Sequence, residues 1–155
     1  MYSQIRTSML DGICAMPVQV EVDISMGMPV FDMVGYLSPE VREAKERVRT
    51  ALHNCGILLP AKRITVNLSP ANIRKTGTGF DLPIAVALLV AMGLVKSEKC
   101  ADTIFSGELN LSGQLLPVRG ILPMVSDGVK EGIHKFVVPA DNLMESRLVQ
   151  GADVC

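Results

Sequence analysis

The sequence contains no tryptophan, two histidines and four cysteines, and aromatic residues make up only 4% of its 155 residues. The cysteines lie at positions 14, 55, 100 and 155, with no C-x-x-C pair and no histidine at zinc-ligand spacing. This scatter argues against a structural zinc site, and a disulfide framework is disfavoured in a chain that is 48% hydrophobic. We expect reduced, mostly buried thiols.

Long apolar runs are also missing. The longest, Leu82 to Val95, has about 14 residues and contains Pro83 and Gly93, whereas a membrane-spanning helix needs about 20. Residues 2–10 alternate polar and apolar side chains, unlike a secretory signal. We therefore expect a cytoplasmic protein that does not contact the membrane, with residues 82–95 in a buried core helix.

Charge is uneven along the chain although the net charge is only −1. Residues 42–75 alone carry a net charge of +6. A basic segment of this kind can form an anion-binding or DNA-binding surface, or it can be the solvated side of a helix. The candidate DNA-contacting residues are Arg42, Lys45, Arg49, Lys62, Arg63, Arg74 and Lys75.

Hydrophobic periodicity predicts a single α/β (α+β, two-layer) domain over residues 1–155. An N-terminal β meander is expected, followed by alternating helices and strands. Ser38 and Asp81 stand where the helix N-caps should be. The predicted elements are strands 3–10, 18–24 and 30–34, a helix from 38 to 55, strand 64–68, a helix from 81 to about 93, hairpin strands 103–108 and 114–118, helix 121–131, strand 135–138 and helix 141–149.

The last four residues, 152–155, have the pattern of a strand that is beginning. We therefore expect the chain to be a fragment of a longer protein. Gly77 and Gly79, just before a predicted helix, suggest a phosphate-binding loop, but the chain has no G-x-x-x-x-G-K-[ST] run. Asp81 would also oppose a phosphate, so we interpret the glycines as permitting a tight loop.

Two stretches resemble the proteolytic domain of Lon-type proteases. Residues 107–120, GELNLSGQLLPVRG, are similar to a hairpin of that domain, and Ile84-Ala85 matches the end of its K-D-G-P-S-A-G-I-A segment. The resemblance places Asp81 at the position of the catalytic serine, and Met124 or Leu122 near that of the lysine. Neither pair forms a serine–lysine dyad, which needs a hydroxyl beside an amine. We expect no catalytic residue.

The whole chain is more similar to the N-terminal domain of YifB/ComM-type, magnesium-chelatase-like AAA+ proteins. The matching segments are VQVEVDISMGMPVFDMVGY at 18–36 and RITVNLSPANIRKTGTGFDLPIA at 63–85. In that family an aspartate at the position of Asp81 belongs to the normal pattern.

This resemblance implies a non-proteolytic, Lon-like domain followed by an AAA+ ATPase module that binds ATP and Mg in the full-length protein. It also implies a hexamer that processes DNA during natural transformation, as a branch-migration motor. The chain itself should need no cofactor and no metal. Two alternatives stay open: a peptidase with a different nucleophile, and a module of a tetrapyrrole magnesium chelatase.

Overall fold

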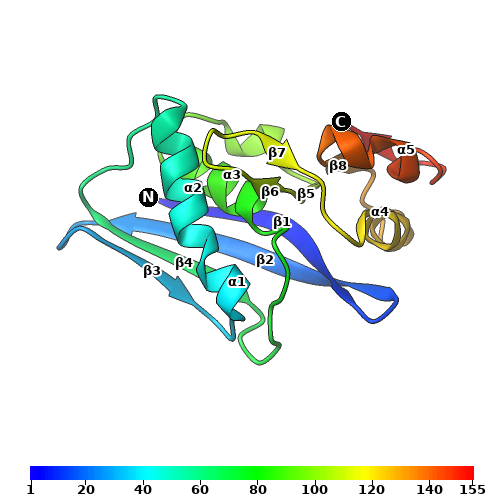
Figure 1. Ribbon diagram of the computed structural model, residues 1–155, viewed down its shortest axis with the longest axis horizontal. Helices are drawn as coiled ribbons and strands as arrows, with labels where there is room; N and C mark the ends of the chain where they lie inside the picture. The colour runs from blue at the N-terminus through cyan, green and yellow to red at the C-terminus, as the bar shows by residue number, and fades with distance from the viewer.

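The computed structural model describes all 155 residues and consists of a seven-stranded sheet with helices packed on it (Figure 1). The strand order is β3-β4-β2-β1-β5-β8-β9. A separate two-stranded hairpin, β6 and β7, lies beside α3. The strands are β1 (Tyr2–Asp11), β2 (Cys14–Ser25), β3 (Val30–Val34), β4 (Arg63–Ser69), β5 (Thr103–Phe105), β6 (Glu108–Leu109), β7 (Leu115–Leu116), β8 (Lys135–Val137) and β9 (Asp153–Val154).

The helices are shorter than the periodicity predicts. The expected helix over 38–55 is divided at Glu43 into two pieces, and the expected helix over 141–149 is a short 3-10 turn followed by a single helical turn. The helical elements are α1 (Pro39–Arg42), α2 (Ala44–Asn54), α3 (Asp81–Ala91), η1 (Ser97–Lys99), α4 (Ile121–Lys130), η2 (Ala140–Asn142) and α5 (Leu143–Ser146).

The α/β class is confirmed, but the expected N-terminal meander is wrong. β1 and β2 form a long antiparallel hairpin, which turns at Gly12 with φ +64°. β3 does not pair with β2. Instead β4 lies between them, antiparallel to β2 and parallel to β3. Because β4 pairs along β2 from Ser25 to Gln19, it occupies the edge that a meander would give to β3. Four of the six strand pairings in the main sheet are parallel.

The main core lies between one face of the sheet and helices α2 and α3. Strict alternation in β2 and β4 sends Val20, Val22, Val66 and Leu68 into this core, where each is completely buried. Toward the edge formed by β5, β8 and β9, both faces of the sheet are buried. Phe105 packs in the main core, whereas its neighbour Ile104 packs with α4 in a second cluster. The sequence predicted two layers. The structure adds α4, which covers the opposite face of the sheet at this edge.

The cysteines are less buried than expected. Cys14, Cys55 and Cys155 are exposed and Cys100 is half-buried, and none is in a disulfide. The strand expected at residues 152–155 is confirmed, since β9 pairs in parallel with β8. No helix has the length and the apolar character needed to cross a bilayer.

Candidate functional site

Asp81, which the Lon resemblance aligns with a nucleophile, is a completely buried carboxylate at the start of α3. It accepts hydrogen bonds from Nε of Arg47 at 2.7 Å and from an Nη of Arg47 at 3.0 Å. The backbone N–H of Leu109 donates a third, at 3.0 Å. The N-cap position belongs to Phe80, and no side chain caps the helix. The predicted capping role is wrong, because the carboxylate links α3 to α2 and to β6.

Arg47 is the functional partner that the sequence reasoning missed. It lies between Ala44 and Ala51, three residues after one and four before the other, so it shares their buried helix face. A buried arginine needs an acidic partner. The position of Arg47 on the apolar face of the predicted helix therefore indicates, from the sequence alone, that an acid lies nearby. Burial raises the pKa of the Asp81 carboxyl, while the Arg47 and Leu109 hydrogen bonds oppose the rise. The bond to Asp81 in turn raises the pKa of Arg47.

Met124, the other position of the expected dyad, has a packing role. It lies in α4, is 3% exposed, and belongs to the cluster of Ile104, Ile121 and Phe136. Asp81 instead lies beside the main core, against α2. The two positions therefore contribute to different packed regions, and neither side chain supplies a hydroxyl or an amine.

Lys75 cannot belong to a DNA-contacting surface, which corrects that prediction. Its side chain is completely buried, and its ammonium group donates to the backbone carbonyl of Pro70. Desolvation lowers the pKa of this lysine. Backbone hydrogen bonds to Tyr36 and from Ser38 fix the residue in place. The serine is the N-cap residue of α1, but its hydroxyl makes no capping bond.

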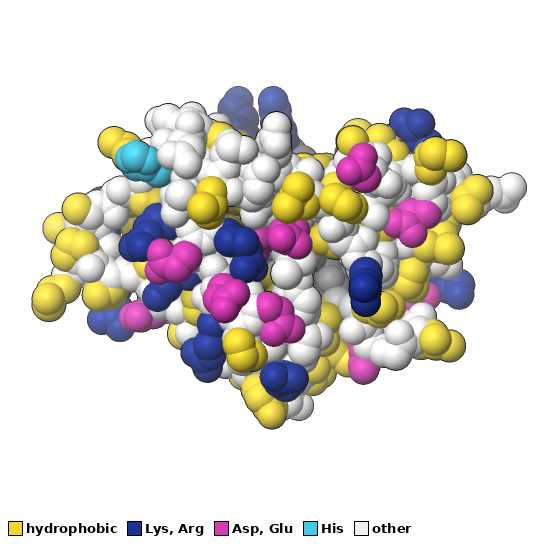
Figure 2. Space-filling view, viewed as in Figure 1, with side chains coloured by type: hydrophobic (Ala, Val, Ile, Leu, Met, Phe, Trp, Pro, Cys, Tyr) yellow, Lys and Arg dark blue, Asp and Glu magenta, His cyan; other side chains and the backbone are white.

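Of the other predicted basic residues, two are already paired on the surface. Arg49 contacts Glu46 at 2.5 Å and Arg63 contacts Asp32 at 3.4 Å. The four without an ion pair are Arg42, Lys45, Lys62 and Arg74. Figure 2 shows that basic and acidic side chains are interleaved over α1 and α2, so the segment does not form a uniformly basic patch.

A hollow of about 450 Å³ adjoins the start of α3, and we call it the Ser106 hollow. It separates the α1–α3 region from the segment that leads into α4, where Figure 2 shows a recess. A Cβ at position 79 would lie 2.8 Å from Oγ of Ser106, so a larger residue there would force this hydroxyl to move. The Ser106 hollow is lined by residues of the end of β1, the loop before α3 and the segments around β6 and β7: Ser8, Met9, Leu10, Thr76, Gly77, Thr78, Gly79, Phe80, Ser106, Glu108, Pro117, Val118 and Arg119.

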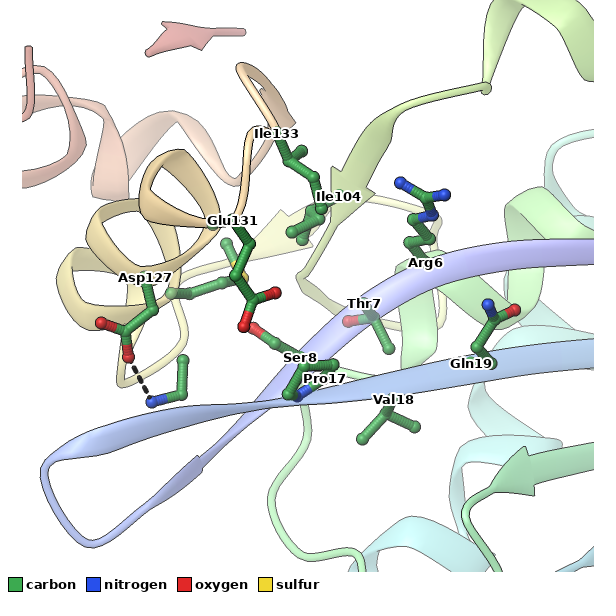
Figure 3. Close-up of a pocket in the computed structure, with 13 residues that line it drawn as sticks. Arg6, Thr7, Ser8, Pro17, Val18, Gln19, Ile104, Asp127, Glu131 and Ile133 are labelled. Carbon is green, nitrogen blue, oxygen red and sulfur yellow. Dashed lines mark hydrogen bonds between the residues drawn. The ribbon is translucent and has the colours of Figure 1, made fainter. Parts of the chain in front are cut away.

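A second hollow of about 310 Å³ lies between α4 and the β1–β2 hairpin (Figure 3). Ile104 and Ile133 form apolar walls, and Arg6 and Glu131 supply charges of opposite sign. The carboxylate of Asp127 is already occupied, since it accepts a hydrogen bond from the backbone N–H of Ala15 at 2.9 Å. This hollow brings together no set of catalytic groups.

Comparison with known proteins gives a family match over residues 20–142, to the family described as subunit ChlI of Mg-chelatase. The chain belongs to this family. It is 42% identical to the uncharacterised protein YifB of Escherichia coli over 149 residues, and 41% identical to the competence protein ComM of Haemophilus influenzae over 144 residues. These alignments cover 96% and 93% of the chain but only 29% and 28% of the relatives.

The Lon resemblance is weaker but present. A Lon protease of Geobacter metallireducens is 25% identical over 130 residues, which is 79% of this chain and 16% of that protein. This similarity agrees with the α/β fold. The ChlI-type chain therefore combines a protease-like fold with Asp81 and Met124 where the Lon resemblance would place the serine and the lysine.

The residues of this ChlI-type chain fit neither the metal that the family name suggests nor a phosphate-binding loop. No three His, Cys, Asp or Glu side chains come together in a geometry that could hold a metal ion. The loop before α3 has glycines at 77 and 79 but no following lysine to reach a phosphate. We therefore assign no metal or nucleotide chemistry to these residues.

Proposed function

We propose that this chain is a non-proteolytic, Lon-like domain of an ATP-driven protein that processes DNA. An AAA+ module outside these residues would bind ATP and Mg, and subunits would assemble as a hexameric ring. The observation that carries the proposal is the 41% identity to the competence protein ComM, which spans 93% of the chain. Since the chain spans less than a third of that relative, the activity belongs to the whole protein.

The site geometry supports a role without peptide cleavage. A serine peptidase needs a hydroxyl and a neighbouring base that can accept its proton. The Ser106 hollow contains hydroxyls, but no histidine or lysine lines it. The buried carboxylate of Asp81 is held by two bonds from one guanidinium, so it is not free to act as a nucleophile or base. The Lon similarity and the Mg-chelatase name of the family point toward the peptidase and chelatase alternatives, but the side chains of this chain supply neither a serine–lysine dyad nor a cluster of metal ligands.

In this proposal, the four basic residues without an ion pair, Arg42, Lys45, Lys62 and Arg74, bind the DNA phosphates. Arg42 and Arg74 are exposed, and Lys45 and Lys62 are half-buried. Long basic side chains can bind phosphates while their stems remain covered. A few weak phosphate interactions in each subunit would add up around a ring, because linked sites bind with a high effective concentration.

The test is DNA binding by the full-length protein with both Arg42→Glu and Arg74→Glu. Affinity should fall at every DNA sequence, and the slope of log K against log salt should decrease by about one unit for each phosphate that the variant no longer neutralises. ATP hydrolysis measured without DNA should stay unchanged, because neither residue lies in the ATPase module.

A matched control reverses two exposed bases elsewhere, Lys96→Glu with Arg147→Glu. Equal losses of affinity in the control and the test variant would assign the effect to net charge alone. Unchanged affinity and slope in the test variant would remove these residues from the DNA interface. Full-length protein that stays monomeric with ATP and DNA would contradict the proposed ring.

A further inference from the structure

The Ser106 hollow contains hydrogen-bond donors that nothing in the chain uses. The backbone N–H groups of Thr78, Gly79 and Phe80, three in succession, donate no hydrogen bond. The N–H groups on either side are occupied, since Gly77 donates to Oε1 of Glu40 at 3.2 Å and Asp81 donates to the carbonyl of Thr78 at 3.5 Å. Successive free N–H groups at the entrance to a helix favour an anionic ligand.

Ser106 provides an independent indication of a ligand. The residue is only 5% exposed, and its hydroxyl faces the hollow and makes no hydrogen bond. The fold holds it beside the free N–H groups, because the N–H of Gly107 donates to the carbonyl of Gly79 at 3.1 Å. A hydroxyl that borders the hollow and has no partner in the protein is free to bind a ligand there.

The charges around the hollow identify the class of anion. Arg119 is exposed there and has no ion pair, so it offers one positive charge. Glu108 also lines the hollow, and Glu40 already accepts from Gly77 beside it. One cation facing two carboxylates disfavours a phosphate dianion or a polyanion. A single carboxylate, which needs fewer positive charges, fits this balance better.

The walls add an apolar component. Met9, Leu10, Pro117 and Val118 line the hollow next to the polar groups. A carboxylate with an apolar side chain directly beside it is the chemical signature of a polypeptide C-terminus that ends in an aliphatic residue. Backbone N–H groups that capture a terminal carboxylate are a known recognition mode in other proteins.

We propose that the Ser106 hollow binds the free C-terminus of a polypeptide ending in an aliphatic residue, without cleaving it. The donors are the N–H groups of residues 78–80, the hydroxyl of Ser106 and the guanidinium of Arg119. The terminal side chain lies against Met9, Leu10, Pro117 and Val118. This inference does not depend on the proposed DNA binding, which uses other residues.

The test titrates the 155-residue chain with an acetylated tripeptide ending in leucine, as the free acid and as the C-terminal amide. Inorganic phosphate serves as the plain anion. Calorimetry gives the affinity, and NMR follows the amide signals of residues 78–80. The free acid should bind and move these signals, the amide should bind at least about 10-fold more weakly, and phosphate should be weaker than the acid.

Variants separate the donors from the neighbouring charges. Arg119→Gln should weaken binding of the acid about 10-fold or more, and Ser106→Ala about 2- to 10-fold. Glu108→Gln should strengthen binding, because it removes a like charge from the hollow. Gly79→Ala should weaken binding at least as much as Ser106→Ala, since its methyl group would displace the Ser106 hydroxyl. Arg147→Gln and Ser97→Ala, at exposed positions outside the hollow, should change nothing.

Three outcomes would overturn the proposal. Phosphate binding as tightly as the peptide acid would make this a phosphate site. Equal binding of the acid and the amide would show that the carboxylate is not recognised. Absence of any binding by the folded chain would leave the free donors without a ligand of this class. If Gly79→Ala fails to fold, the Arg119→Gln and Glu108→Gln pair, which alters only charge, still decides the question.

Discussion

Replacing Arg47 by methionine should destabilise the fold more than any substitution of its partner, Asp81. The change keeps most of the aliphatic stem but removes two charge-assisted hydrogen bonds, of 2.7 and 3.0 Å, from a completely buried carboxylate. Only the N–H of Leu109 would remain to stabilise that charge. Removing one partner of a buried pair costs about 3–5 kcal/mol, so we expect a decrease of this size in the free energy of unfolding.

Asp81→Asn should cost less, about 1–3 kcal/mol, because the amide oxygen can still accept from Leu109. Arg47 is not left alone in that variant, since its side chain is 19% exposed, donates to the Glu40 carbonyl and lies 3.7 Å from Glu43. The double variant should be more stable than the sum of the two single effects implies, by more than about 1 kcal/mol.

The assay is urea denaturation of the four proteins, followed by circular dichroism at pH 7 and again near pH 4.5. Without Arg47, only the N–H of Leu109 opposes the effect of burial, so the pKa of the Asp81 carboxyl rises further. An acid with a raised folded-state pKa is favoured in the fold below its unfolded pKa and penalised as pH rises through the folded value. Arg47→Met should therefore lose less stability at the lower pH. A destabilisation under about 1 kcal/mol at pH 7, with Asp81→Ala costing more, would refute this account and restore a capping role.

Three further expectations follow from other parts of the structure. The chain should cleave neither casein nor fluorogenic peptides and should show no calorimetric binding of Mg-ATP; turnover abolished by substitution in the Ser106 hollow, or stoichiometric ATP binding, would contradict this. Lys75 has a lowered pKa, so its burial penalty is present below the folded pKa and disappears as pH rises toward the unfolded value. Wild-type stability relative to Lys75→Met should thus increase at alkaline pH, and parallel pH profiles of the two proteins would contradict it. Gly128→Ala should cost about 1–3 kcal/mol in thermal unfolding, because the new Cβ would lie 2.8 Å from the Phe136 ring, whereas Ser126→Ala on the same helix should cost far less.

The sequence alone determined the elements whose residues carry a local signal. Alternation along β2 and β4 identified their buried faces, because side-chain direction in a strand depends only on position. The motifs at 18–36 and 63–85 identified the family, which the match over residues 20–142 confirms. The expected absence of a serine–lysine dyad also rested on residue types alone.

Only the tertiary structure decided which groups meet. The order of strands depends on long-range pairing, so nothing local in β3 indicates that β4 separates it from β2. Asp81 and Arg47 are 34 residues apart, and a helix-start aspartate looks the same in sequence whether it caps the helix or faces a guanidinium. Lys75 and Arg74 are adjacent, yet one is buried and the other exposed, because backbone direction rather than residue type sets their exposure. The Ser106 hollow likewise exists because pairing between Gly79 and Gly107 joins two segments that are distant in the chain.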